Sequence, residues 1–193
     1  MKEKSNKQVL INFIKRYGYI VLLSVIMLVI SIIVAVSATK PEETDKTVQV
    51  GNDAVTFYNP LLSCTVAKEY NDKNLVYNTT LKQWEAHKGV CLTAAENSEV
   101  FAVLDGTVED VYSNYLNGTV VVINHGGNLK TSYASLKENV AVKVGDVVSK
   151  GDVIGRVGVT ENGELNLGNH LHFEVIENSV KVDPMAYLNF ENK

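Results

Sequence analysis

The chain has 193 residues, of which 46% are apolar and 21% charged, so it is long enough for one globular domain with appendages and too apolar for wholesale disorder. Its 13 glycines, three prolines and two cysteines exclude a collagen-like repeat and a dense disulfide scaffold. The net charge of −4 is unevenly distributed: residues 1–17 sum to +4, residues 18–38 carry no charge, and residues 39–193 sum to −8. A domain this acidic argues against nucleic acid as a partner.

Residues 18–38 are the first predicted element, a helix of 21 residues without a charged side chain. At 1.5 Å per residue such a helix spans about 30 Å, the thickness of a bilayer's hydrocarbon core. The basic residues before it predict a single transmembrane helix with residues 1–17 in the cytoplasm and the remainder outside. A cleaved signal peptide is the alternative, since VAVSA–T at 34–39 resembles a cleavage site. Either reading places the working domain outside the cytoplasm.

We expect residues 39–84 to form a polar stalk and lead-in segment, with a short helical stretch near 71–84. The working domain is then predicted at 85–190. Cys64 and Cys91 both lie in the external part, where an oxidising compartment permits a disulfide between them.

From Val100 onward, short β-branched runs alternate with glycine turns. FAVLDGTVEDVYS predicts a hairpin at Asp105-Gly106, and GTVVVIN predicts a strand buried on both faces. VAVKVGDVVSKGDVIGRVG predicts three short strands separated by two Gly-Asp turns. This spacing is typical of a compact sandwich or barrel, so the sequence predicts an all-β external domain preceded by one transmembrane helix.

His170 and His172 lie in the segment GNHLHFEV. Side chains two residues apart on a strand project from the same face, so both imidazoles converge while Leu171 and Phe173 point into the core. Such a pair can present a metal ligand beside a proton-transfer group. Glu174 lies on the same face as the histidines, and we expect it to orient or pair with nearby groups. We assign no role to His125.

The segments WEAHKGVCLTA, TSYASL, HLHFEV and the closing VDPMAYL occur in the order typical of one enzyme family. Over about residues 83–188 the chain resembles the M23 (LytM-type) zinc metallopeptidases. That family carries His-x-x-x-Asp, Tyr-x-His-Leu and His-x-His, and its zinc is held by the first His, the Asp and the last His. The resemblance implies a β-sandwich or barrel, a zinc ion and peptidoglycan cross-bridges as substrate.

The family's motifs carry over to this chain only in part. By resemblance, His87 and His172 are zinc ligands and His170 is one of the two catalytic histidines. Cys91 replaces the aspartate ligand, and Ser135 replaces the other catalytic histidine. A cysteine thiolate binds zinc well, so His87, Cys91 and His172 form the expected metal site, unless Cys91 merely fills the space left by the aspartate. Serine cannot exchange a proton near neutral pH, so we expect His170 to be vestigial and peptide hydrolysis to be lost.

The segment KEYNDKNLVYNTTLKQWEAHKGV resembles a narrower, membrane-anchored sporulation group within the same family. This resemblance implies a forespore membrane protein whose external domain lies in the intermembrane space. There it would dock a protein of the mother-cell membrane in a channel-like assembly or ring needed for engulfment. Strand addition at Val120–Asn124 or around 153–157 is one way to dock.

Two other functions remain open on the sequence. The first is a zinc-dependent peptidoglycan endopeptidase with a His-Cys-His metal site. The second is a biotinyl or lipoyl carrier, because VKVGDVVSKGDVIGRVG is similar to the strands of those domains. The expected hairpin, however, has no lysine at the turn where such a domain carries its cofactor.

Overall fold

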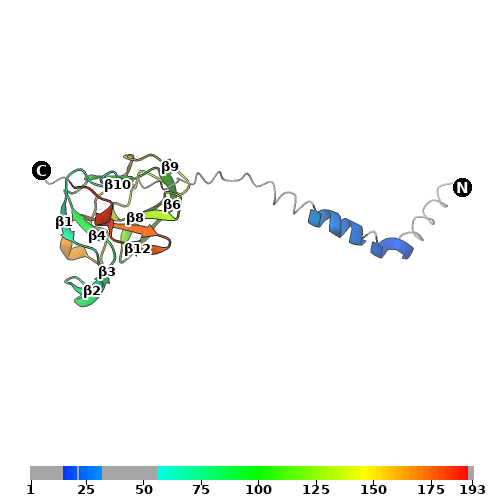
Figure 1. Ribbon diagram of the computed structural model, residues 1–193, viewed down its shortest axis with the longest axis horizontal. Coiled ribbons are helices and arrows are strands. Elements are labelled where there is room, and N and C mark those ends of the chain that lie inside the picture. Colours follow the sequence, from blue (N-terminus) through cyan, green and yellow to red (C-terminus); the bar gives the residue numbers. More distant parts are fainter. Residues whose placement is uncertain (1–14, 21, 32–55, 191–193) are drawn as a thin grey trace. The chain divides into compact units, whose positions relative to one another are not determined.

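A computed structural model describes residues 15–20, 22–31 and 56–190 (Figure 1). The chain divides into two units, Met1–Asp45 and Lys46–Lys193. In the first unit, residues 15–20 and 22–31 are helical. The predicted membrane helix at 18–38 is not supported: within the described part of the chain, no helix combines the length and the apolar character needed to cross a bilayer. Residues 21 and 32–38 of the predicted span lie outside the described residues.

The second unit is built on one antiparallel sheet of eight strands. Seven of its strands follow the order β1-β4-β11-β8-β7-β6-β9, and the eighth, β12, pairs with β11 outside this order. The strands are β1 (Thr65–Lys68), β4 (Val90–Thr93), β6 (Gly106–Asn114), β7 (Gly118–Asn124), β8 (Leu129–Leu136), β9 (Val147–Val148), β11 (His170–Glu177) and β12 (Val180–Val182). The mainly β domain predicted from the sequence is therefore confirmed, with a single large sheet as its frame.

Two smaller sheets accompany the large one. One pairs β5 (Glu99–Phe101) with β10 (Val153–Arg156), and the other is the hairpin of β2 (Asn71–Asn78) and β3 (Gln83–His87), seen projecting from the domain in Figure 1. Short 3-10 turns occur at η1 (Leu165–Leu167) and η2 (Pro184–Ala186).

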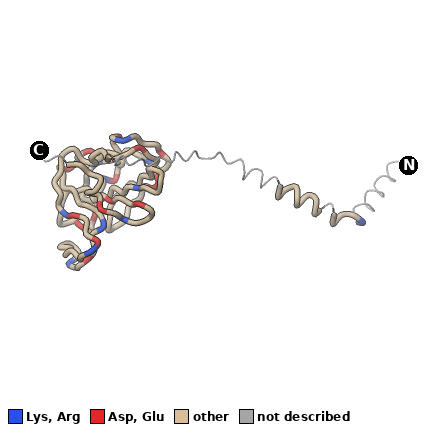
Figure 2. Tube along the Cα trace, in the orientation of Figure 1, with Lys and Arg blue, Asp and Glu red and all other residues tan. Residues whose placement is uncertain are grey.

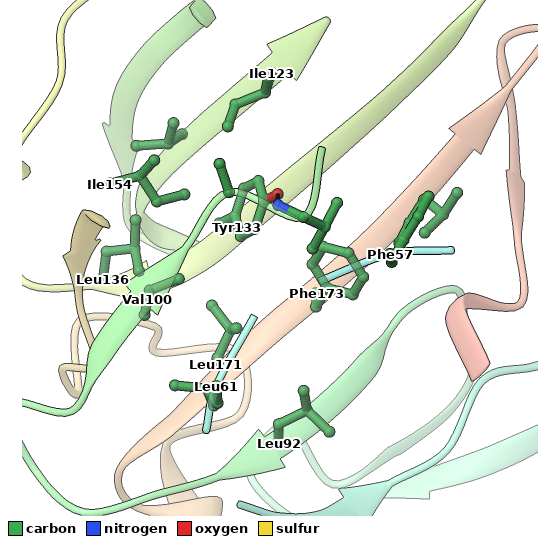
Figure 3. Close-up of a cluster of buried hydrophobic side chains, with 14 of the residues drawn as sticks. Phe57, Leu61, Leu92, Val100, Ile123, Tyr133, Leu136, Ile154, Leu171 and Phe173 are labelled. Atoms are coloured by element: carbon green, nitrogen blue, oxygen red, sulfur yellow. Dashed lines mark hydrogen bonds between the residues drawn. The ribbon is translucent and has the colours of Figure 1, made fainter. Parts of the chain in front are cut away.

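The core lies against one face of the large sheet. Leu171, Phe173 and Val175 alternate along β11 and are fully buried, as the two-residue period of the strand predicts. Figure 3 shows Leu171 and Phe173 in the same cluster as Tyr133 of β8. The rings of Tyr133 and Phe173 lie 5.2 Å apart between centroids. Because this face of β11 is filled, its histidines are left on the opposite face.

The local pairings differ from the sequence-based predictions in several places. Residues 71–84 form most of the β2–β3 hairpin, not a helical stretch. Asp105-Gly106 does not close a hairpin, because β5 pairs with β10 while β6 pairs with β7 and β9. Of the three strands expected in 140–157, only β9 and β10 form.

Strand β7 is buried as predicted, but it cannot accept a strand from a partner. It is bonded to β6 on one side and to β8 on the other, so Val120–Asn124 has no free edge. Acidic and basic residues both occur along the trace of the β domain (Figure 2), but the charged residues between Lys88 and Lys130 are all acidic.

Candidate metal centre

The register of three neighbouring strands places three polar side chains in one row. Lys68 of β1 is opposite Cys91 of β4, and Cys91 is in turn opposite His172 of β11. Residues directly opposite each other in an antiparallel pair have side chains on the same face. The sheet therefore brings Cys91 and His172 together, although 81 residues separate them in the sequence.

His87 enters from the end of β3, just before the chain turns into β4. The turn contains Gly89, and a Cβ atom there would lie 2.7 Å from His172 Nε2 and 2.9 Å from the Phe173 carbonyl oxygen. Glycine at this position lets the turn pass directly over β11. The HKGVC segment thus positions His87 and Cys91 against the same histidine.

A fourth group, Glu164, completes the cluster. It comes from the loop that joins β10 to β11 and is only 6% exposed. The ligand atoms of His87, Cys91, Glu164 and His172 all lie within 4.8 Å of one another. Cys91 Sγ is 3.3 Å from His87 Nε2, 3.4 Å from His172 Nδ1 and 2.7 Å from Glu164 Oε2.

Both histidines of the cluster are oriented by a second hydrogen bond. His87 Nδ1 lies 2.7 Å from the Glu69 carbonyl oxygen, so this nitrogen donates and Nε2 faces the cluster. His172 Nε2 lies 3.2 Å from Glu174 Oε1, which leaves Nδ1 toward the cluster. A histidine that ligates a metal characteristically has its other nitrogen held by a carbonyl or a carboxylate. The predicted pairing role of Glu174 fits this arrangement.

Burial and hydrogen bonding shift the pKa values of the cluster's residues in opposite directions. Burial raises the pKa of the Cys91 thiol to about 12, despite the opposing effect of His172. Burial would likewise raise the pKa of Glu164, but hydrogen bonds from His172 and His87 outweigh it and hold that pKa well below its usual range. For His172, burial lowers the pKa, but hydrogen bonds to Cys91, Glu164 and Glu174 outweigh this effect and hold the pKa well above its ordinary value. The metal-free cluster thus pairs a neutral thiol with a carboxylate and an imidazolium.

The donor set and its spacing fit zinc. Two imidazole nitrogens, a sulfur and a carboxylate oxygen are all common zinc ligands. Four such donors around a tetrahedral ion lie about 3.3–3.6 Å from one another, given bond lengths of about 2.0–2.3 Å. The distances from Cys91 Sγ to the two histidine nitrogens fall in this range. The Glu164 carboxylate lies 3.2 Å from His172 Nδ1 through Oε2 and 3.6 Å from His87 Nε2 through Oε1. The Cys91–Glu164 distance, at 2.7 Å, is the one of these that falls well below the range, as expected for a thiol that donates to a carboxylate.

His170 lies beside this group but is fully engaged by other partners. Its Nδ1 donates to the Gly168 carbonyl at 2.8 Å, and its Nε2 is 3.1 Å from Glu161 Oε2. Ser135 is completely buried, and its hydroxyl lies 3.5 Å from the Gly158 carbonyl oxygen. Neither residue belongs to the four-member cluster.

The structure brings together the three residues predicted as metal ligands, His87, Cys91 and His172. Both cysteines are free thiols, so the disulfide that the compartment would permit is not formed. Glu161, Glu164 and Lys68 were not predicted from the sequence. The sequence around the two glutamates is polar and contains glycine, which is typical of an exposed loop. Only their position shortly before His-x-His could have indicated a role.

Comparison with known proteins places this site in a family. The profile of Peptidase family M23 matches residues 85–184, slightly more than half of the chain. Stage II sporulation protein Q of Bacillus subtilis is 32% identical over 157 residues, which cover 80% of this chain and 54% of that protein. The chain therefore spans about half the length of this curated relative.

Solved structures show the same relationship. The structure of the SpoIIQ-SpoIIIAH pore-forming complex contains a chain that matches with a TM-score of 0.62 and 27% identity, covering 70% of this chain and 92% of that one. A zinc-containing peptidase from Vibrio cholerae matches with a TM-score of 0.55 and 28% identity, covering 65% of this chain and 36% of that one.

Proposed function

This chain belongs to peptidase family M23, and on that premise we propose that it is a sporulation protein whose β domain docks a SpoIIIAH-like partner and does not cleave peptidoglycan. The observation that carries the proposal is the likeness, over 70% of the chain, to a protein solved in the SpoIIQ-SpoIIIAH pore-forming complex. A second SpoIIIAH–SpoIIQ complex matches to the same extent, with a TM-score of 0.61.

The proposal implies a place of action. The domain works at the forespore membrane, in the space between the forespore and the mother cell. Its partner there is the external domain of stage III sporulation protein AH, and together they form a channel-like assembly that supports engulfment. The 32% identity to stage II sporulation protein Q supports this assignment.

Two features of the site argue against hydrolysis. By family resemblance, position 135 would hold a catalytic histidine, and here it holds a buried serine directed at a backbone carbonyl. Loss of a general acid–base group typically costs about 10²–10⁴-fold in rate. His170, the remaining member of the catalytic pair, is bonded at both ring nitrogens.

Direct binding tests the docking function. The purified full chain is titrated with the external domain of the SpoIIIAH homologue from the same organism, and we expect saturable binding. A catalytically active M23 peptidase of similar size is the control, since it shares the fold but not the sporulation likeness, and it should not bind. Absence of saturable binding by the full chain would overturn the proposal.

A zinc-dependent peptidoglycan endopeptidase is the second candidate, because the three predicted ligands do converge and a zinc-containing peptidase shares the fold. Zinc-loaded full chain is incubated with purified peptidoglycan, and released fragments are separated by chromatography. We expect no fragments above the level of protein-free controls. Fragment release that disappears in His172→Ala would establish the endopeptidase instead.

A further inference from the structure

Glu164, like Cys91, contacts each of the other three members of the cluster. Its Oε2 lies 2.7 Å from Cys91 Sγ and 3.2 Å from His172 Nδ1, while its Oε1 lies 3.6 Å from His87 Nε2. The carboxylate therefore occupies the remaining side of the space that the two histidines and the cysteine enclose. In a three-ligand zinc site, that side is where a water molecule binds.

Glu164 is also fixed in this position. Lys68, the outer member of the row across β1, β4 and β11, places its Nζ 2.5 Å from Glu164 Oε1. Only 11% of the lysine side chain is exposed, so this ion pair is shielded from water. One carboxylate oxygen is thus held from outside the cluster while the other faces the sulfur and the imidazole.

The loop that carries Glu164 is tied to the β2–β3 hairpin on both sides of this residue. The Asn78 side-chain amide donates to the Gly163 carbonyl at 3.0 Å, and the Asn166 backbone N–H donates to the Thr80 hydroxyl at 3.1 Å. Asn78 is buried. These two bonds hold the residues on either side of Glu164 against the hairpin.

We propose that Glu164 is a fourth protein ligand that closes the zinc site, so that a bound zinc ion is structural and has no position for water. Structural zinc sites are closed by four protein ligands, whereas catalytic sites keep one position open. The charges also balance, because a cysteine thiolate and a carboxylate together neutralise Zn²⁺. Lys68 acts as a positioning residue through its bond to Glu164. This inference goes beyond docking and does not depend on it.

Cobalt substitution tests the closure without any measurement of activity. The full chain is stripped of metal and titrated with Co²⁺, whose absorption bands report the coordination number and the presence of a thiolate. We expect the wild type to show intense four-coordinate bands and a sulfur charge-transfer band, and to be unaffected by added azide. In Glu164→Ala the charge-transfer band should remain, while azide should now change the spectrum because a position has opened.

Three further variants separate this effect from general damage. Glu96→Gln changes an exposed glutamate that pairs with Lys137 and lies outside the four-member cluster, so its spectrum should match the wild type. Glu164→Gln keeps the side chain's shape and should bind Co²⁺ more weakly. Lys68→Met should weaken Co²⁺ binding about 10–100-fold and keep the four-coordinate bands.

The closed site would be overturned by any of three results. These are a wild-type spectrum that responds to azide, a Glu164→Ala spectrum that does not, and a wild-type chain that binds no Co²⁺. Each of these results would leave the partner-binding experiment unaffected, so the two proposals fail separately.

Discussion

The Cys91 thiol donates to the Glu164 carboxylate, with 2.7 Å between Sγ and Oε2, across 73 residues of sequence. The pKa of this thiol is raised to about 12 and that of His172 lies well above its ordinary value, so both groups hold a proton near neutral pH when no metal is bound. A zinc ligand must be deprotonated, which makes metal uptake a proton-releasing step.

We therefore expect about two protons to be released per zinc bound at neutral pH, one from Cys91 and one from His172. The measurement is calorimetry of zinc binding in buffers of different ionisation enthalpy. Cys91→Ala should release about one proton fewer, whereas Cys64→Ser, which alters the other free thiol, should leave the number unchanged. Equal proton release from Cys91→Ala and wild type would contradict the assignment of the thiol as a ligand.

Gly89→Ala should weaken zinc binding because the new methyl group would lie 2.7 Å from His172 Nε2 and displace the imidazole. The expected loss is about 10–100-fold in affinity, the range typical when a ligand's orientation is disturbed. Competition with a chelator of known affinity measures it. Lys88→Ala, one residue earlier and exposed, is the control and should bind as the wild type does.

Tyr133→Phe should destabilise the domain because it leaves a buried backbone donor without its acceptor. The Val103 N–H donates to the Tyr133 hydroxyl at 3.0 Å, and both residues are fully buried. We expect a loss of about 1–3 kcal/mol in the free energy of unfolding, measured with urea. The same change at Tyr115, which is 76% exposed, should stay within about 0.5 kcal/mol, so equal effects at both positions would refute the explanation.

His125 should make stability fall with decreasing pH. Burial lowers the pKa of this histidine, whose ring nitrogens lie 2.8 Å from the Asp105 carbonyl oxygen and 2.7 Å from the Thr131 hydroxyl. Because the folded-state pKa lies below the unfolded value of about 6.5, the contribution is fully present above that value and is lost as pH falls through the folded-state pKa.

Urea unfolding of metal-stripped protein at a series of pH values checks this direction. We expect the wild type to lose more stability on acidification than His125→Gln, which cannot titrate. If the two proteins lost stability in parallel, the titration would have to be assigned to other groups.

Much of β11 could be predicted from the sequence because strand periodicity is a local property. The alternation of polar and apolar residues over 170–173 indicates directly which face of the strand is polar and which is buried. Pairing partners are not local, and this is where prediction failed. Asp105-Gly106 has the composition of a hairpin turn, yet the strands on either side of it pair with β10 and with β7 and β9.

The predicted metal ligands could be found by motif, His87 and Cys91 through their spacing of four residues and His172 through the His-x-His pair that it forms with His170. Lys68 and Glu164 could not. Lys68 reaches the cluster only because β1 pairs with β4, whereas the sequence predicts a stalk and lead-in for its segment. Glu164 belongs to a polar loop, and nothing in its composition indicates that the hairpin of β2 and β3 holds it in a buried position.

The Cys91–His172 register also bears on how the sheet forms. In an unfolded chain only short-range sets of donors are close together, such as His87 with Cys91, and His172 joins that pair when β11 pairs with β4. A slip of one residue between these strands would bring Leu171 or Phe173 opposite Cys91 and turn the histidines toward the core. A bound ion would therefore stabilise one alignment of β4 and β11 over its neighbours. Refolding in the presence of zinc would therefore select the native pairing of β4 and β11. Contacts between residues distant in sequence, such as these, are the slowest to form.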